Sequence, residues 1–227
     1  MYTLVLLSGG IGSRMHNNIP KQYMLLAGKP MIMHVLEKVD LVDAITKIVI
    51  VCAESDQSSV KQMLDQYGIS KRVEFALPGA TRQGSVLSGL QKVETTQVII
   101  HEAARPFVKI EDYQELINED AENAMFGIEI PFTVVRGHNN VEGILDRSTL
   151  VNVQLPQKFN TKLILAAHQK AATENKHFTE DASLLFYYSP ETKIKIVKGK
   201  EYNIKVTTRI DMLTGEVIYD EIFRRRK

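Results

Sequence analysis

The strongest constraint on the fold of this chain is the alternation of short apolar runs with helical patterns. Runs of strand length occur at residues 2–7 (YTLVLL), 47–52 (KIVIVC) and 97–102 (QVIIHE). Helical patterns cover residues 55–68 and 82–93. Nearly continuous Val, Ile and Leu residues are typical of parallel strands that helices cover on both faces. The sequence therefore predicts an α/β fold with a Rossmann-like, mostly parallel sheet.

The second half of the chain departs from this pattern in one region. A strand predicted over residues 126–132 is followed by the turn cluster RGHNN, and regular patterns resume only near LPQKF. We interpret residues 133–157 as a projecting β-arm. Beyond the arm, the sequence predicts a helix, a strand and a last amphipathic helix, at residues 162–175, 194–199 and 210–223.

Length and composition narrow the class of protein. The 227 residues are enough for a sizeable core, and we interpret residues 1–227 as one domain. The apolar runs are too short to cross a bilayer and no export signal is recognisable, so we expect a cytoplasmic protein without membrane contacts. A net charge of +1 gives no strong field for nucleic acid. The single cysteine, Cys52, is expected to be a small buried apolar residue.

The stretch GGIGSRM, directly after the first predicted strand, carries the clearest chemical signal. Glycines leave backbone N–H groups uncovered, and such groups can cradle an anion. Gly9, Gly10 and Gly12 would supply these donors, while Arg14 and Lys21 would add two cations. A polyphosphate removed from water needs partners of both kinds. The stretch therefore predicts a binding site for a nucleoside triphosphate.

Other interpretations of this glycine-rich stretch fit less well. A Walker loop needs Ser or Thr after its lysine, where the segment AGKP has Pro30. A dinucleotide fingerprint needs a third glycine and an acidic residue at the very end of the second strand, where GGIGSRM lacks the glycine and KIVIVC ends in Cys52. A turn that only joins strand to helix stays open as an alternative, although it gives no reason for Arg14 and Lys21.

The segment LPGATRQGSV is a second candidate for ligand binding. Gly79 lies in a turn before a helix that is predicted to open near Arg82 and Ser85. Helix N-termini attract polar ligands. A solvated loop that only caps the helix is the alternative.

Two further candidates lie later in the chain. HEAARP ends a predicted strand, where open α/β folds place ligands, so Glu102 could hold a divalent cation. Alternatively, Glu102 could form a structural ion pair with Arg105. Lys205 stands in a polar break between apolar elements, in the segment YNIKVTT.

In this order, the clusters resemble the family of cytidylyltransferases that act on sugar-alcohol phosphates, which includes the 2-C-methyl-D-erythritol 4-phosphate and ribitol-5-phosphate cytidylyltransferases. The matching segments are GGIGSRM, PKQY, RQGSV, HEAARP, DRSTLVNVQLPQKF, TEDAS and NIKVT. They run almost from end to end of the chain. The resemblance implies an enzyme that uses CTP and Mg²⁺, transfers CMP to a polyol phosphate and releases pyrophosphate.

The resemblance also implies a role for each candidate residue. Those that would bind CTP are Leu7, Ser8, Gly9, Gly10, Gly12, Gly79, Arg82 and Ser85. The catalytic cations would be Arg14, Lys21 and Lys205, of which Lys205 would approach the α-phosphate. Glu102 would hold Mg²⁺, and Ala103 and Arg105 would lie beside the nucleotide and the acceptor.

By the same resemblance, the β-arm would clasp a second copy of the chain. The homodimer would have composite active sites, in which Arg147 on the arm of one chain holds the acceptor phosphate in the site of the other.

Departures from the family pattern concentrate on the acceptor side. Glu102 and Tyr202 stand where aspartates are usual, and LSGG replaces a commoner PAAG. RQGSV favours methylerythritol phosphate and isoprenoid precursor biosynthesis, whereas LSGG favours ribitol phosphate and cell-envelope polymers. We prefer the first acceptor. A nucleotide-binding regulator without catalysis is a further alternative, which the mutual repulsion of several retained cations disfavours.

Overall fold

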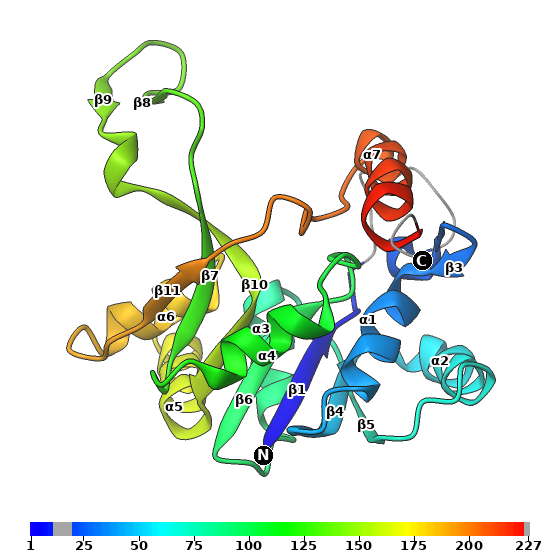
Figure 1. The fold of residues 1–227 in the computed structure, drawn as a ribbon. Helices are drawn as coiled ribbons and strands as arrows, with labels where there is room; N and C mark the ends of the chain where they lie inside the picture. Colours follow the sequence, from blue (N-terminus) through cyan, green and yellow to red (C-terminus); the bar gives the residue numbers. More distant parts are fainter. Residues whose placement is uncertain (11–19, 225–227) are drawn as a thin grey trace.

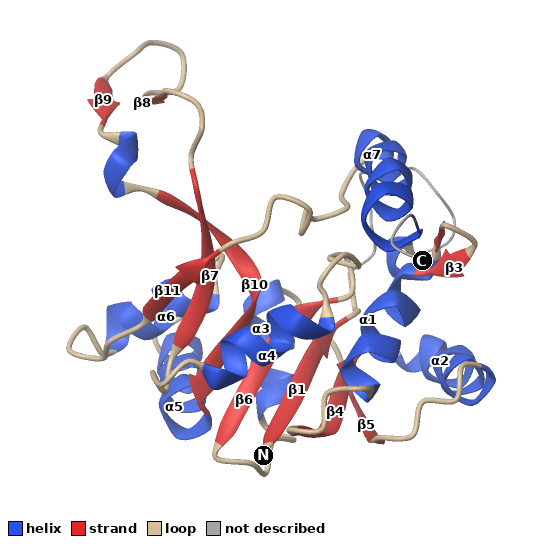
Figure 2. Cartoon of the chain, viewed as in Figure 1, coloured by secondary structure: helices blue, strands red, loops and turns tan. Residues whose placement is uncertain are grey.

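The computed structural model describes residues 1–10 and 20–224. Within these residues, the central element is a seven-stranded sheet with the strand order β11-β7-β10-β6-β1-β4-β5 (Figures 1 and 2). Its strands, in chain order, are β1 (Tyr2–Leu7), β4 (Ile45–Val51), β5 (Arg72–Ala76), β6 (Gln97–Glu102), β7 (Ala124–Glu129), β10 (Val151–Asn160) and β11 (Lys195–Lys198). β10 runs antiparallel to β6 and β7, and the other neighbouring strands are parallel. The predicted mostly parallel sheet is confirmed.

Helices cover both faces of this sheet. Their bounds are α1 (Met31–Asp40), α2 (Glu54–Gln66), α3 (Arg82–Leu90), α4 (Ile110–Asn118), α5 (Thr161–Thr173), α6 (Asp181–Tyr188) and α7 (Arg209–Tyr219). Leu4 and Leu6 of β1 enter a core with α1, α2 and α4, whereas Val5 between them enters a second core with α3, α5 and α6. Burial on both faces is the reason that β1 is apolar at consecutive positions.

The predicted strands and helices agree with the observed ones to within a few residues at their ends. β1 and β6 have the predicted bounds. The sequence interpretation missed α1, α4, α6 and β5. Cys52 is a buried free cysteine of the first core, as expected.

A β-hairpin stands clear of the sheet at the edge where β7 ends (Figure 1). It consists of β8 (Val134–Arg136) and β9 (Gly143–Leu145), followed by a short 3₁₀ turn at Arg147–Thr149. We call residues 130–150 the arm. The predicted end of the arm at residue 157 is wrong, because β10 pairs with β7 from Val151 onward and belongs to the main sheet.

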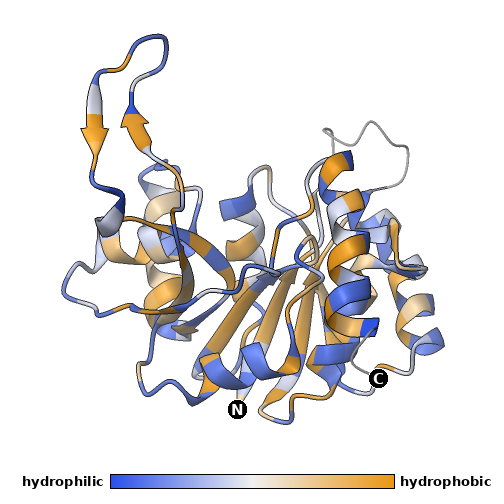
Figure 3. Cartoon of the chain, turned by 45° about the horizontal axis from the view of Figure 1, so that its top comes forward, coloured by the Kyte–Doolittle hydropathy of each residue, from blue (hydrophilic) through white to orange (hydrophobic). Residues whose placement is uncertain are grey.

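Hydrophobic colour runs along the strands of the central sheet and reappears on β8 and β9 of the arm (Figure 3). Small strands β2 (Leu25–Leu26) and β3 (Lys29–Pro30) pair with each other beside α7 (Figure 1). None of the helices in the described ranges combines the length and apolar composition needed to span a bilayer.

Candidate active site

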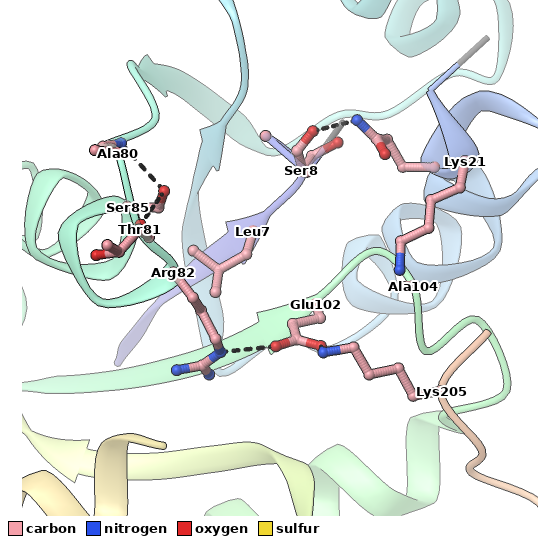
Figure 4. Close-up of a pocket in the computed structure, with 14 residues that line it drawn as sticks. Leu7, Ser8, Lys21, Ala80, Thr81, Arg82, Ser85, Glu102, Ala104 and Lys205 are labelled. Atoms are coloured by element: carbon pink, nitrogen blue, oxygen red, sulfur yellow. Dashed lines mark hydrogen bonds and ion pairs between the residues drawn. The ribbon is translucent and has the colours of Figure 1, made fainter. Parts of the chain in front are cut away.

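A cleft of about 390 Å³ lies at the carboxyl ends of β1 and β6. This is the sheet edge where open α/β folds place ligands. The residues that line the cleft are Leu7, Ser8, Gly9, Gly10, Lys21, Gln22, Gly79, Ala80, Thr81, Arg82, Ser85, Glu102, Ala104 and Lys205 (Figure 4). Segments that are far apart in the sequence therefore meet in one cleft.

Hydrogen bonds hold the first of these segments in place. The Ser8 N–H donates to the Val51 carbonyl at the end of β4, at 2.8 Å. The Gln22 side chain donates to the Ser8 carbonyl. Lys21 Nζ donates to the Val206 carbonyl at 3.1 Å, so Lys21 lies next to the segment that carries Lys205.

Two glycines of the cleft allow close approaches that a side chain would prevent. A Cβ on Gly9 would lie 2.6 Å from Cβ of Pro78, and one on Gly79 would lie 2.6 Å from the carbonyl carbon of Gly84. The loop before α3 therefore packs closely against the end of β1 and against its own helix. At Gly10, a Cβ would have no described atom within 4 Å, so Gly10 has room that the other two lack.

The start of α3 forms one wall of the cleft. Thr81 caps the helix, with its side-chain oxygen accepting from the Gly84 N–H at 3.0 Å. The Ser85 hydroxyl donates to the Thr81 carbonyl at 2.9 Å and accepts from the Gly79 N–H at 3.1 Å. Helix capping and a position in the cleft, which the sequence left as alternatives for this segment, thus occur together.

Glu102 lies between two cations at the floor of the cleft (Figure 4). Arg82 Nε donates to Oε1 at 2.8 Å, and Lys205 Nζ lies 2.6 Å from Oε2. Burial acts to raise the pKa of Glu102, but Lys205 and Arg82 outweigh it and lower the pKa to about 2. The alternative of an ion pair with Arg105 is wrong, since the Arg105 guanidinium donates to the Asn203 carbonyl instead, at 2.9 Å.

Some of the predicted site residues lie elsewhere. Ala103 is fully buried in the core, and its neighbour Ala104 lines the cleft. Arg105 is not among the lining residues. Arg147 lies on the arm, where its guanidinium donates to the Pro131 carbonyl. Gly12 and Arg14 are outside the described residues.

The chain matches the family model for 2-C-methyl-D-erythritol 4-phosphate cytidylyltransferase over residues 2–221. It belongs to this family. A Bacillus cytotoxicus protein of that name is 36% identical over 220 residues, which cover 95% of this chain and 96% of the relative. The chloroplastic protein of that name from Oryza sativa is 32% identical over 225 residues, covering 96% of this chain and 74% of the relative.

Solved structures agree with this assignment. The 4-diphosphocytidyl-2C-methyl-D-erythritol synthase of Anaerococcus prevotii superposes with a TM-score of 0.85 at 25% identity, over 95% of this chain and 94% of that one. The 2-C-methyl-D-erythritol 4-phosphate cytidylyltransferase of Thermus thermophilus, at 22% identity, shows the same fold with a TM-score of 0.74 over 96% of this chain and 98% of that one. The predicted family, fold class and enzyme class are confirmed.

The donor set of the cleft suits a metal that arrives with a nucleotide. Among the residues that the structure describes, His, Cys, Asp and Glu form no group of three that could hold a metal. Glu102 offers one carboxylate, whose Oε2 is buried and faces Lys205 without hydrogen-bond geometry. Mg²⁺ commonly uses one or two carboxylates together with substrate phosphates. Glu102 therefore fits Mg²⁺ if the nucleotide supplies the remaining ligands.

Sequence reasoning missed several residues of the cleft and its support. Gln22, Ala80 and Thr81 line the cleft, and Asp181 forms an ion pair with Arg82 from behind the wall. The segment TEDAS, which matches the family, was the signal available for Asp181. Thr81 was recognisable as a capping residue three positions before Gly84.

Proposed function

We propose that this chain transfers CMP from CTP to 2-C-methyl-D-erythritol 4-phosphate and releases pyrophosphate, a step of isoprenoid precursor biosynthesis. The observation that carries the proposal is the convergence of bare backbone at residues 7–10 with Lys21 and Lys205 in one cleft. The family membership of the chain supports the same acceptor. Ribitol 5-phosphate is not favoured, since the family model and the curated relatives carry the methylerythritol phosphate name.

The chemistry requires two anions to meet. An oxygen of the acceptor phosphate attacks the α-phosphorus of CTP, a new P–O bond forms, and the bond to the β-phosphate oxygen breaks as pyrophosphate leaves. Coulomb repulsion opposes this approach, so positioning and cations account for most of the catalysis. Lys21 and Lys205 supply positive charge, and the N–H groups near Gly9 and Gly10 supply fixed dipoles. Arg14, which lies outside the described residues, is proposed as a third cation.

Each remaining site residue has a proposed contact. Leu7, Ser8 and Gly12 bind the triphosphate through the backbone. Gly79, Arg82 and Ser85 frame the cytosine and ribose, and Ala103 and Arg105 support the segment beside the acceptor. Mg²⁺, when bound through Glu102 and phosphate oxygens, would neutralise developing charge on the phosphates. Lys205 would then exchange its contact with Glu102 for one with the nucleotide.

The arm is proposed to bind a second copy of the chain. Arg147 is not a lining residue of the cleft in its own chain, which supports a role in the site of a partner. The acceptor phosphate would be its ligand, and the homodimer would have two composite sites. We further propose that residues 1–227 act as a single domain, and the cytoplasmic location stays a prediction from the sequence.

A pyrophosphate-release assay tests the proposal. CTP and Mg²⁺ are supplied with methylerythritol phosphate, ribitol phosphate or glycerol phosphate in parallel reactions, and the CDP-alcohol is identified by mass. We expect release with methylerythritol phosphate and little with the other two. Release only with ribitol phosphate would overturn the choice of acceptor, and release with none of them would overturn the function.

A further inference from the structure

A line of ionisable side chains runs from the core to the cleft. His168 Nε2 lies 3.1 Å from Asp181 Oδ1, and Asp181 Oδ2 accepts from Arg82 Nη2 at 2.7 Å. Arg82 Nε continues the line to Glu102, and Glu102 to Lys205. The line thus joins α5, α6 and α3 to the carboxyl end of β6.

The two inner members of this line have no access to the cleft. His168 is 0% exposed and Asp181 is 1% exposed, and neither lines the cleft. An ionised carboxylate only accepts hydrogen bonds, so the hydrogen between them lies on His168 Nε2. Burial acts to raise the pKa of Asp181, yet Arg82 and His168 lower it to about 2. Of the two side chains that Asp181 contacts, only Arg82 lines the cleft.

Two carboxylates hold the Arg82 guanidinium from different sides. An arginine side chain is long and has many rotamers, so ordering it on ligand binding would weaken affinity. Here Glu102 accepts a hydrogen bond from Arg82 Nε, and Asp181 accepts one from Arg82 Nη2. Both hydrogen bonds are charge-assisted. The side chain of Arg82 is 25% exposed, and its other N–H groups are available to a ligand in the cleft.

We propose that Asp181, with His168 behind it, is a positioning residue that orders Arg82 for contact with the nucleotide. The proposal rests on the proposed function, because Arg82 is assigned there to the cytosine and ribose of CTP. The proposal assigns a role in nucleotide binding to the Asp181 carboxylate and the His168 imidazole, neither of which would contact the substrate. Asp181 acts through its contact with Arg82 Nη2, and Arg82 contacts Glu102 through a different nitrogen, Nε.

The test measures the Kd of CTP in Mg²⁺ buffer by calorimetry, without acceptor, for the full chain. Asp181→Asn keeps the shape of the side chain and removes its charge, and we expect the Kd to rise about tenfold or more. In an Arg82→Ala background, Asp181→Asn should cause no further rise. Glu180→Gln is the matched control, since Glu180 caps the same helix through Ala182 and Ser183 and does not contact Arg82.

The outcomes separate this proposal from the proposed function. An unchanged Kd for CTP in Asp181→Asn overturns the positioning role. The role is also overturned if Asp181→Asn raises the Kd by the same factor in the Arg82→Ala background as it does in the wild-type chain. If Asp181→Asn does not fold, His168→Phe replaces it, with a rise of about threefold expected for a weakened partner. A normal Kd in folded His168→Phe then overturns the proposal. Failure of the wild-type chain both to bind CTP and to release pyrophosphate overturns the proposed function and this inference together.

Discussion

The cleft and the arm differ in whether their side chains have partners within the same chain. In the cleft, Arg82 and Lys205 each form an ion pair with Glu102 of the same chain. On the arm, by contrast, Phe132 is 76% exposed and Ile144 is 82% exposed. The cleft is organised by contacts that one chain supplies. The exposed apolar side chains of the arm, by contrast, belong to none of the cores that the described residues form.

This difference has a physical cause. An isolated two-stranded hairpin is at best marginally stable in water, because it has no further strand or helix against which its apolar side chains can pack. Clustered exposed apolar side chains on a protein surface mark a site for another molecule. We therefore expect substitutions in the cleft to lower the catalytic rate of each chain. Substitutions on the arm should instead act by weakening the association of two chains.

The largest expected effect is that of Lys21→Ala. Removal of one preorganised cation should lower kcat/KM about a hundredfold or more, because the repulsion between the two anions is then less well balanced. Kinetics of pyrophosphate release measure this, with thermal unfolding as a check on the fold. Lys162→Ala, at an exposed position on α5, is the matched control and should have normal kinetics. Equal activity of Lys21→Ala and wild type would contradict the proposed site.

Arg147→Ala connects the two regions and should have the next largest effect. Loss of a charge-assisted contact to the acceptor phosphate should lower kcat/KM for methylerythritol phosphate roughly thirtyfold. The KM for CTP should stay near the wild-type value, because the cleft of the same chain is intact.

Mixed dimers show on which chain Arg147 acts. Chains with Lys21→Ala and chains with Arg147→Ala are mixed in equal amounts and allowed to exchange subunits. If Arg147 acts in the partner's site, half of the dimers have one intact site, and activity should return to about a quarter of wild type. Activity no higher than the mean of the two variants would mean that it acts in its own chain.

The ion pairs of the cleft predict that the unfolding free energy of the chain depends on pH. We expect no such contribution from the apolar side chains of the arm. The folded-state pKa of Glu102, about 2, lies below its ordinary value of 4.5, so its contribution is present above pH 4.5 and is lost as pH falls toward 2. Between pH 6 and pH 3, wild type should lose about 2 kcal/mol more unfolding free energy than Glu102→Gln.

Urea unfolding at the two pH values measures this difference. Glu191→Gln, at an exposed position, is the control and should follow wild type. The same acid-induced loss in Glu102→Gln as in wild type would show that the buried ion pairs do not control stability in this pH range.

The smallest effect is expected on the arm itself. Ile144→Lys places a charge in the proposed interface and should raise the dimer dissociation constant about tenfold, which sedimentation velocity can measure. The unfolding midpoint at a concentration where wild type is monomeric should stay the same, since Ile144 contributes little to the core. A dimer as tight as that of wild type would move the interface away from β9.

Much of this molecule could be predicted before its structure. β1 and β6 were predicted at their observed bounds because burial on both faces makes a strand apolar at every position. Gly9, Gly10 and Lys21 of the cleft were predicted because bare amides beside cations have few structural uses, whereas Leu7 and Ser8 were predicted from the family resemblance. The end of the arm was misplaced, since β10 alternates apolar and polar residues near Val151 and resembles a hairpin strand there.

The partner of Glu102 could not be predicted in the same way. Arg105 was a natural choice because it is near in sequence and of opposite charge. In the structure, Arg82 and Lys205 reach the carboxylate from other segments, and Asp181 reaches Arg82 from behind. Side-chain partners depend on distances that only the folded chain defines.

The amino-acid sequence by itself determined the layers of this protein and the chemical character of its cleft, since both depend on local composition and on periodicity along the chain. The tertiary structure decided which charges face one another and which side chains stay exposed on the arm. The physical reason is that electrostatic and packing energies depend on separations of a few ångströms in space, and residues far apart in the sequence reach those separations only when the sheet has formed.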